Sequence, residues 1–265
     1  MKLLDNESSS GLLDLSPDVL RGLHDKHPEA AYIAEESLLH GPVDYIQPNV
    51  YDLIDEEMIY NSASKTKGSA GPSGMDSELY RRIMCSKNCK TEGKILREEI
   101  RSDMIDMFTR NLLKKSYHPF FLEAFTSCRL IPLDKNPGIR QMGVGEVLRR
   151  IVGKTVGGFL KEEIREAASP LHVCAGHNAG AEAAIHAMSQ VFEEEGTDGI
   201  LLIDASNAFK QMNRSADSHS IQITCKEMAL YVINTCRSPS RLFICGGGEI
   251  LSQEGTTQGD PLAMP

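Results

Sequence analysis

Apolar residues recur at helical spacing along most of the chain. In residues 11–25, Ser16 and Pro17 precede an apolar face, which predicts a helix with a serine N-cap and a proline in its first turn. The residues of that face are Val19, Leu20 and Leu23. Residues 93–115 have the clearest helical pattern. Its predicted buried face consists of Ile95, Ile100, Met104, Ile105, Phe108 and Leu112. Similar spacing predicts helices at residues 49–63, 75–84, 146–168, 181–195 and 228–236.

Other segments have the patterns of strands. Residues 125–133 and 139–145 flank the turn DKNPG, which predicts a β-hairpin, and the three glycines of RLFICGGGEILSQEG predict a second one. The run GILLIDA, residues 199–205, is apolar up to Asp204, which predicts a buried strand with an acid at its edge. Because helices and strands are mixed along the chain, the predicted fold class is α+β.

The composition is that of a globular protein, with 41% hydrophobic and 25% charged residues among 265. No apolar stretch reaches the roughly 18 residues of a membrane span, and the N-terminus MKLLDNESSS lacks the apolar segment of a secretory signal. Seven cysteines without regular spacing fit a reduced environment. We therefore expect an intracellular protein, in the nucleus or cytoplasm, that is not secreted and has no membrane partner. The sequence identifies no protein partner.

The net charge of −9 hides a strong division along the chain. Residues 1–80 hold 5 basic and 15 acidic side chains, residues 81–165 hold 18 and 10, and residues 166–265 hold 5 and 12. A basic middle between acidic flanks is typical of a local surface for a polyanion. It is equally compatible with three blocks that neutralise one another.

The segment LLIDASNAFKQMNR, residues 201–214, carries the most informative candidate chemistry. Asp204 directly follows the apolar run, where a carboxylate is costly to bury unless a cation or a bound metal pairs with it. The alternative is an ordinary strand-end aspartate whose side chain caps the next helix. This segment alone does not decide between the two.

Four segments in one order together resemble a known family. They are KGSAGPSGMD, CRLIPLDKNPGIRQMGVGEVLRRIVGK, DASNAF and, some fifty residues later, GTTQGDPL. This series resembles the reverse transcriptases of retroelements, chiefly those of non-LTR retrotransposons and group II intron maturases, and it covers about residues 65–265. The resemblance implies a right-hand polymerase fold with fingers and a partial palm. It divides the chain into an acidic helical extension (1–64), a fingers region (65–198) and a partial palm (199–265).

The resemblance also implies roles for single residues. Asp204 matches the first catalytic carboxylate, which is a ligand of the paired Mg²⁺ ions, with Mn²⁺ as a substitute. Phe209 matches the aromatic residue beneath the sugar of the incoming nucleotide. Arg140 matches the arginine that binds the triphosphate, since a planar guanidinium suits phosphate oxygens.

The remaining candidates contact the template or the nucleotide. Gln258 and Gly259 match the loop that touches the pair of template base and nucleotide, and Lys135 lies in the fingers hairpin but is shifted from the family's usual lysine position. The basic middle segment supplies candidates for nucleic-acid backbone contacts: Arg149, Arg150 and Lys154. In GTTQGDPL, Thr257 and Asp260 replace the proline and serine that are usual in the family.

The implied function is RNA-directed DNA polymerisation, with an RNA or DNA template-primer and dNTPs as partners. Family members continue into a hairpin that bears Tyr/Phe-x-Asp-Asp, whose acids complete the metal site. This sequence stops at Pro265, before such a hairpin. We therefore expect this chain to be inactive by itself and Mg²⁺ to bind only in a complete domain. The alternatives are a non-catalytic nucleic-acid-binding remnant of a transposable element and an unrelated α/β binding protein.

Overall fold

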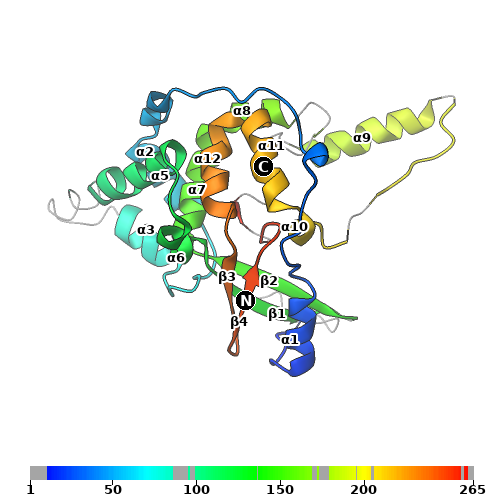
Figure 1. Cartoon of the computed structure of the whole chain (residues 1–265), viewed down its shortest axis with the longest axis horizontal. Coiled ribbons are helices and arrows are strands. Elements are labelled where there is room, and N and C mark those ends of the chain that lie inside the picture. Colours follow the sequence, from blue (N-terminus) through cyan, green and yellow to red (C-terminus); the bar gives the residue numbers. More distant parts are fainter. Residues whose placement is uncertain are drawn as a thin grey trace.

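The structure is a computed structural model. It describes residues 11–85, 95, 99–135, 137–168, 172, 179–194, 196–203, 206–257 and 260–261. It combines many helices with one four-stranded sheet, so the fold is mixed α and β, which is compatible with the expected α+β class (Figure 1). The helices up to the first hairpin are α1 (Pro17–His24), η1 (Glu35–Ser37), η2 (Pro48–Leu53), α2 (Glu56–Lys65), α3 (Ser77–Cys85), η3 (Ile100–Asp106), α5 (Met107–Lys114), η4 (Pro119–Leu122) and α6 (Glu123–Thr126). Those that follow are α7 (Val147–Phe159), α8 (Lys161–Ala167), α9 (Gly180–Glu193), α10 (Ala208–Gln211), α11 (Arg214–Thr224) and α12 (Lys226–Cys236).

Two hairpins form a four-stranded sheet of order β2-β1-β3-β4. The strands are β1 (Cys128–Asp134), β2 (Ile139–Gly145), β3 (Ser240–Ile244) and β4 (Glu249–Ser252). Each hairpin is antiparallel, and β1 pairs in parallel with β3. Both predicted hairpins are confirmed. The second turns on Gly246, Gly247 and Gly248, all at positive φ, where a residue with a Cβ would be strained.

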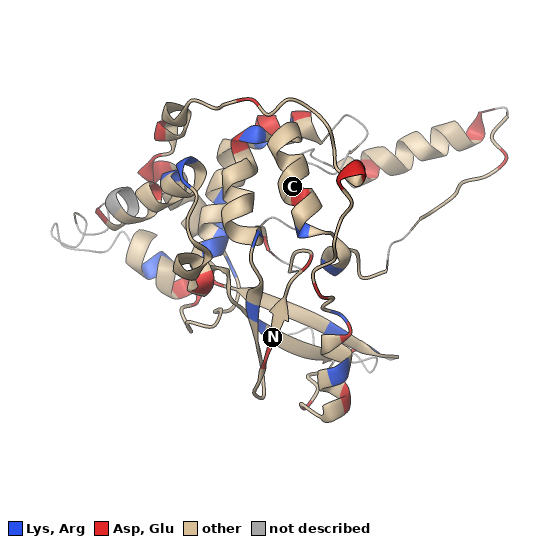
Figure 2. Ribbon diagram, viewed as in Figure 1, with Lys and Arg blue, Asp and Glu red and all other residues tan. Residues whose placement is uncertain are grey.

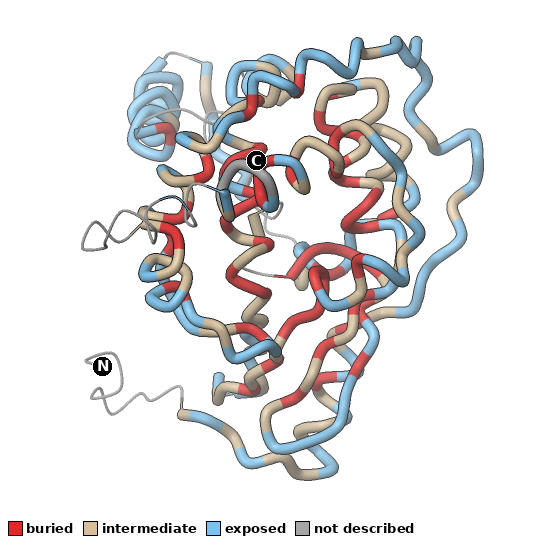
Figure 3. Tube along the Cα trace, turned by 90° about the vertical axis from the view of Figure 1, so that its left-hand side faces the viewer, coloured by how far each residue is buried: buried red, intermediate tan, exposed pale blue. Residues whose placement is uncertain are grey.

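Two clusters of buried side chains hold the fold together. The larger joins helices from the whole chain, for example Ile59 of α2, Leu112 of α5, Ile151 of α7 and Tyr231 of α12. The smaller lies on one face of the sheet, where α1 covers it through the fully buried Leu23. Buried segments accordingly run through the inner helices and the strands (Figure 3). The N-terminal helices thus belong to both cores. The proposed division at residue 64 falls within α2, and the division into regions stays a prediction.

The first helix has the predicted boundary. The Ser16 side chain accepts a hydrogen bond from Val19 N at 3.2 Å, so it caps α1 as the sequence indicates. The predicted helix at 49–63 is divided into η2 and α2, and Asp55 caps α2 by accepting from Met58 N. The predicted helix at 146–168 is divided at Leu160 into α7 and α8.

The predicted face of 93–115 is only partly correct. Ile105 and Leu112 are buried, whereas Ile95 and Met104 are 50% and 63% exposed. For Met104 the reason is that residues 100–106 form the π-helical stretch η3, whose wider turns rotate successive side chains differently from an α-helix. A constant 3.6-residue period therefore misplaces one side chain within that stretch.

The predicted buried strand at 199–205 is wrong for its described residues. Leu201, Leu202 and Ile203 are 82%, 81% and 85% exposed and belong to no strand. The segment returns from the far end of α9, which projects from the body, toward α10 (Figure 1). An apolar run expresses a preference for burial, but β3 rather than this run pairs with β1. Asp204 itself lies outside the described residues.

Acid is expected to destabilise the fold through His27. Its Nδ1–H donates to Leu23 O at 2.8 Å, while Nε2 is buried with no partner among the described residues. Burial lowers the pKa of His27 to about 4. As pH falls below 6.5, the unfolded chain binds a proton that the folded state resists, so unfolding free energy declines by roughly 2–3 kcal/mol down to pH 4. Denaturant titrations at pH 6.5 and pH 4 measure this decline in the unfolding free energy. The decline should be smaller by that amount in His27→Leu than in the unmodified chain, and an equal decline in both would contradict the assignment.

Candidate nucleic-acid interface

The first two family-like segments meet at the start of α7. Ser73 donates from its backbone N and its Oγ to the two carboxylate oxygens of Glu146, at 2.7 and 2.6 Å. Arg150 Nη1 donates to Lys67 O at 2.7 Å, and its Nη2 donates to Ser69 O. The glycine-rich loop of residues 67–76 is therefore tied to the helix that follows the β1–β2 hairpin.

The third and fourth segments meet in the same way. Thr256 N donates to Phe209 O at 2.6 Å, and Lys210 Nζ donates to Thr257 Oγ1 at 3.4 Å. Gly255 has φ +61°, and a Cβ there would lie 2.0 Å from Phe209 O. Only glycine permits so close an approach of the two backbones. The described parts of DASNAF and GTTQGDPL are thus direct neighbours.

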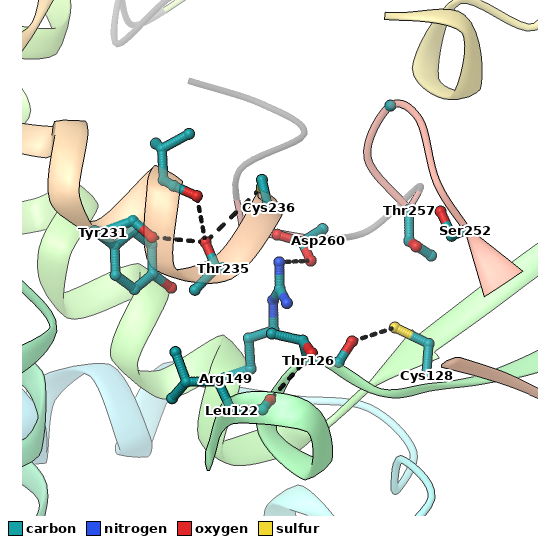
Figure 4. Close-up of polar contacts among 12 residues, drawn as sticks. Leu122, Thr126, Cys128, Arg149, Tyr231, Thr235, Cys236, Ser252, Thr257 and Asp260 are labelled. Atoms are coloured by element: carbon teal, nitrogen blue, oxygen red, sulfur yellow. Dashed lines mark hydrogen bonds and ion pairs between the residues drawn. The ribbon is translucent and has the colours of Figure 1, made fainter. Parts of the chain in front are cut away.

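A buried ion pair connects the second segment to the fourth. Arg149 Nη2 lies 2.8 Å from Asp260 Oδ2, and both side chains are 5% exposed (Figure 4). Burial alone lowers the pKa of Arg149, but the Asp260 carboxylate and other neighbours outweigh it, so this pKa is raised. A Cβ on Gly143 would lie 1.9 Å from Thr257 Cγ2, so the hairpin also packs tightly against this segment. The four family-like segments therefore form one connected region.

Arg149 lies inside the protein, contrary to its expected role in contacting a nucleic-acid backbone. Its guanidinium is enclosed and paired with Asp260, so it has an internal role in place of the expected surface contact. Arg140 and Lys135 lie exposed on β2 and at the turn of the first hairpin. Neither forms an ion pair with a described carboxylate within 4 Å. Gln258 and Gly259 lie outside the described residues.

A basic cavity lies between α2 and α7. It has a volume of about 300 Å³, and Lys154 from α7 and Lys65 from α2 are among the residues that line it. Its other lining residues are Met58, Asn61, Ser62, Thr155, Gly158 and Phe159. Burial lowers the pKa of Lys154, and the nearby positive charge of Arg150 lowers it further. Figure 2 shows basic positions along α7.

Lys65 is a site residue that the sequence did not indicate. It is far from Lys154 in sequence and lies in the last turn of a helix, where a lysine is common. Only the packing of α2 against α7 brings the two lysines to the wall of one cavity. Arg150 and Lys154, by contrast, stand four residues apart on α7, a spacing that places them on one helix face. Lys65 and Lys154 form the basic groove of this surface, and the charge of Arg150 acts on Lys154 from nearby.

A second cavity adjoins Phe209. It measures about 460 Å³, and its walls come mainly from α8, α10, α11 and α12. Phe209 is 42% exposed at its edge, and Asp217 is among its polar lining residues. Burial raises the pKa of Asp217 above its usual value. Such a cavity accommodates a flat or apolar part of a ligand beside the Phe209 ring.

Two features are absent from the described part of the chain. Its residues include no cluster of three or more His, Cys, Asp or Glu side chains able to hold an ion. They also include no helix with the length and apolarity of a membrane span. Neither a family model nor a curated protein matches the chain.

Proposed function

We propose that this chain binds nucleic acid as the fingers and part of the palm of a reverse-transcriptase-like polymerase. The observation that carries the proposal is the convergence of the four family-like segments. They are separated widely in sequence, and yet Glu146, Arg149 and Lys210 connect them through buried or half-buried contacts. Unrelated loops that resembled the family by coincidence would have no physical reason to converge.

In this proposal the basic groove holds phosphates of the template strand. Lys65 and Lys154 provide ammonium groups from two helices, and Arg150 stiffens the adjoining loop through its hydrogen bonds to Lys67 O and Ser69 O. Contacts to phosphates give affinity that is largely independent of sequence and falls with salt. Arg140 and Lys135, on the exposed hairpin, would face the triphosphate of an incoming nucleotide, and Phe209 its sugar.

The second candidate function is nucleic-acid binding without catalysis. The groove and the hairpin support both functions equally, because neither contains the catalytic acid. Asp204 is the residue that would hold Mg²⁺, and the metal would stabilise charge at the reacting phosphate. Because Asp204 lies outside the described residues, no step of the proposal depends on the metal. Primer extension with Mg²⁺ or Mn²⁺ by a longer chain that supplies the family's Asp-Asp hairpin separates the two functions.

Charge reversal in the groove is expected to weaken RNA binding and its salt dependence together. For the double variant Lys65→Glu/Lys154→Glu, we expect at least tenfold weaker binding of single-stranded RNA at about 50 mM salt. The slope of log K against log[salt] should become shallower by about 1.4, since each lost single-strand phosphate contact accounts for about 0.7. Fluorescence anisotropy with a labelled oligoribonucleotide measures both quantities.

The matched control changes the same net charge elsewhere. Arg21 on α1 and Lys226 on α12 form ion pairs with Asp18 and Asp44 away from the groove. The variant Arg21→Glu/Lys226→Glu should retain most of the affinity and the original salt slope. If both double variants weaken binding equally, only net charge matters and the groove is not the site. If the unmodified chain shows no salt-dependent binding, the proposed function itself is wrong.

A further inference from the structure

Two phenylalanines stand exposed on a short, firmly held turn. Phe120 and Phe121 of η4 are 71% and 73% exposed, and their rings meet edge to face with centroids 5.9 Å apart. The turn begins with Pro119 and is anchored by Leu122, which is 2% exposed. Exposing two aromatic rings to water is energetically unfavourable, and a contiguous exposed apolar surface often marks an interaction site. None of these residues belongs to the family-like segments.

The pair forms one side of a cavity of about 680 Å³, larger than the cavity beside Phe209. The cavity has further aromatic walls, contributed by Tyr80, Phe108, Phe125 and Phe243. Among these walls, Phe108 and Phe125 pack edge to face with 5.3 Å between their centroids. The volume falls within the roughly 300–1,000 Å³ of sites that take small molecules or single chemical groups.

Arginines lie beside this aromatic cavity. The Arg241 guanidinium stands 5.0 Å from the centroid of the Phe243 ring and is held by Glu123 at 2.9 Å and Glu249 at 2.6 Å. Arg129 is the register partner of Phe243 across the β1–β3 pair, so both side chains project from the same face of the sheet. The Nε of Arg129 is buried and has no hydrogen-bond partner among the described residues.

Charge decides which part of a ligand enters the cavity. Arg241 is the basic residue among the described side chains that line it, and it is already paired with Glu123 and Glu249, so the cavity offers no unpaired cation for a phosphate. It offers aromatic faces, which suit a flat uncharged ring. Arg129 lies beside the cavity on the sheet face, half-buried and in no ion pair with a described carboxylate. Proteins that bind single strands combine these two elements, aromatic side chains for bases and basic side chains for the backbone.

We propose that this cavity takes an unpaired nucleobase of a single strand, stacked against Phe120 or Phe121, with Arg129 contacting a neighbouring phosphate. The inference rests on the proposed nucleic-acid binding and adds a preference for single strands over duplexes. A base in a duplex is stacked between its neighbours and paired, so it cannot enter the cavity without being extruded.

The test uses a short oligoribonucleotide that contains the fluorescent base 2-aminopurine, alone and annealed to its complement. Binding of the single strand should change the 2-aminopurine emission, and Phe120→Ala/Phe121→Ala should abolish that change. The same variant should weaken single-strand binding about tenfold, which corresponds to about 1.4 kcal/mol, and leave duplex binding unchanged. Both rings are largely exposed, so the variant is expected to fold. Phe192→Ala, which alters a 51% exposed phenylalanine on α9, serves as the control and should change nothing.

Two results would overturn the inference alone. One is RNA binding that responds to Lys65→Glu/Lys154→Glu but not to the double phenylalanine variant. The other is unchanged RNA binding together with loss of concentration-dependent self-association in sedimentation, which would make this surface a contact for a second protein chain. Absence of any RNA binding by the unmodified chain would overturn the inference and the proposed function together.

Discussion

Asp260→Ala is expected to lower the free energy of unfolding by about 3–5 kcal/mol, because it leaves the Arg149 guanidinium buried without its counter-ion. Arg149 and Asp260 are each 5% exposed, so water cannot replace the lost carboxylate without opening the structure. Chemical denaturation followed by circular dichroism measures the effect. The pair joins α7 to the GTTQGDPL segment, so the size of this loss tests whether the two segments are in contact.

A double substitution separates the ion pair from other effects at the same place. Arg149→Met/Asp260→Ala removes both charges and should be more stable than Asp260→Ala alone, since no unpaired buried charge remains. Asp18→Ala is the matched control, because Asp18 pairs with Arg21 where both side chains are more than three-quarters exposed. An exposed pair contributes at most about 1 kcal/mol. Equal effects of Asp260→Ala and Asp18→Ala would contradict a buried pair.

Arg214→Met is the second substitution with a large expected effect, again a loss of about 3–5 kcal/mol. Arg214 is 8% exposed at the start of α11. Its guanidinium donates to Gly255 O at 2.8 Å, Ser238 O at 3.0 Å and Ser252 Oγ at 3.0 Å. Methionine fills a similar space but donates nothing, so these acceptors lose their partner where water has little access. Thermal unfolding and denaturant titration both measure the loss.

The control for this substitution is Arg237→Met. Arg237 follows α12 and donates to Ser116 Oγ at 3.0 Å and to Tyr117 O on the exposed surface. Water can take over those bonds, so we expect a loss below about 1 kcal/mol. Arg214→Met should also lower the protection of Gly255 N from hydrogen exchange, because it loosens the loop beside Phe209. An Arg214 variant as stable as the Arg237 variant would show that the 214–255 contact does not form.

Local patterns in the sequence predicted the elements whose signals are local. Ser16 and Pro17 define the start of α1 through a cap and a fixed φ, and both depend only on neighbouring residues. The turn glycines 246–248 likewise define the second hairpin by themselves. The sequence did not indicate α11, because its segment RSADSHSIQIT is mostly polar and has few apolar residues to define a buried face. Its Asn213 cap, which accepts from Ala216 N, was the one available signal.

Properties that depend on long-range packing were not predictable in the same way. Arg149 and Arg150 are adjacent and equally basic, but one points into the Asp260 contact and the other toward the carbonyls of residues 67 and 69. Which side of α7 faces the core decides where each arginine points, and the sequence alone does not show how α7 packs. Lys65 was not predicted as a site residue for the same reason, because only the packing of α2 against α7 places it beside Lys154. The exposure of Leu201–Ile203 shows the converse, because an apolar run does not specify whether a partner strand is available.

Photo-crosslinking tests most directly whether the family-like segments converge on a surface that binds nucleic acid. Single-stranded RNA with 4-thiouridine at several positions would be irradiated with the unmodified chain, and crosslinked peptides identified by mass spectrometry. We predict crosslinks in the end of α2, in η4, in the β1–β2 hairpin and on the exposed face of α7, all of them reduced by added salt. Crosslinks confined to α9 and the 199–203 segment, or none at low salt, would contradict the claim.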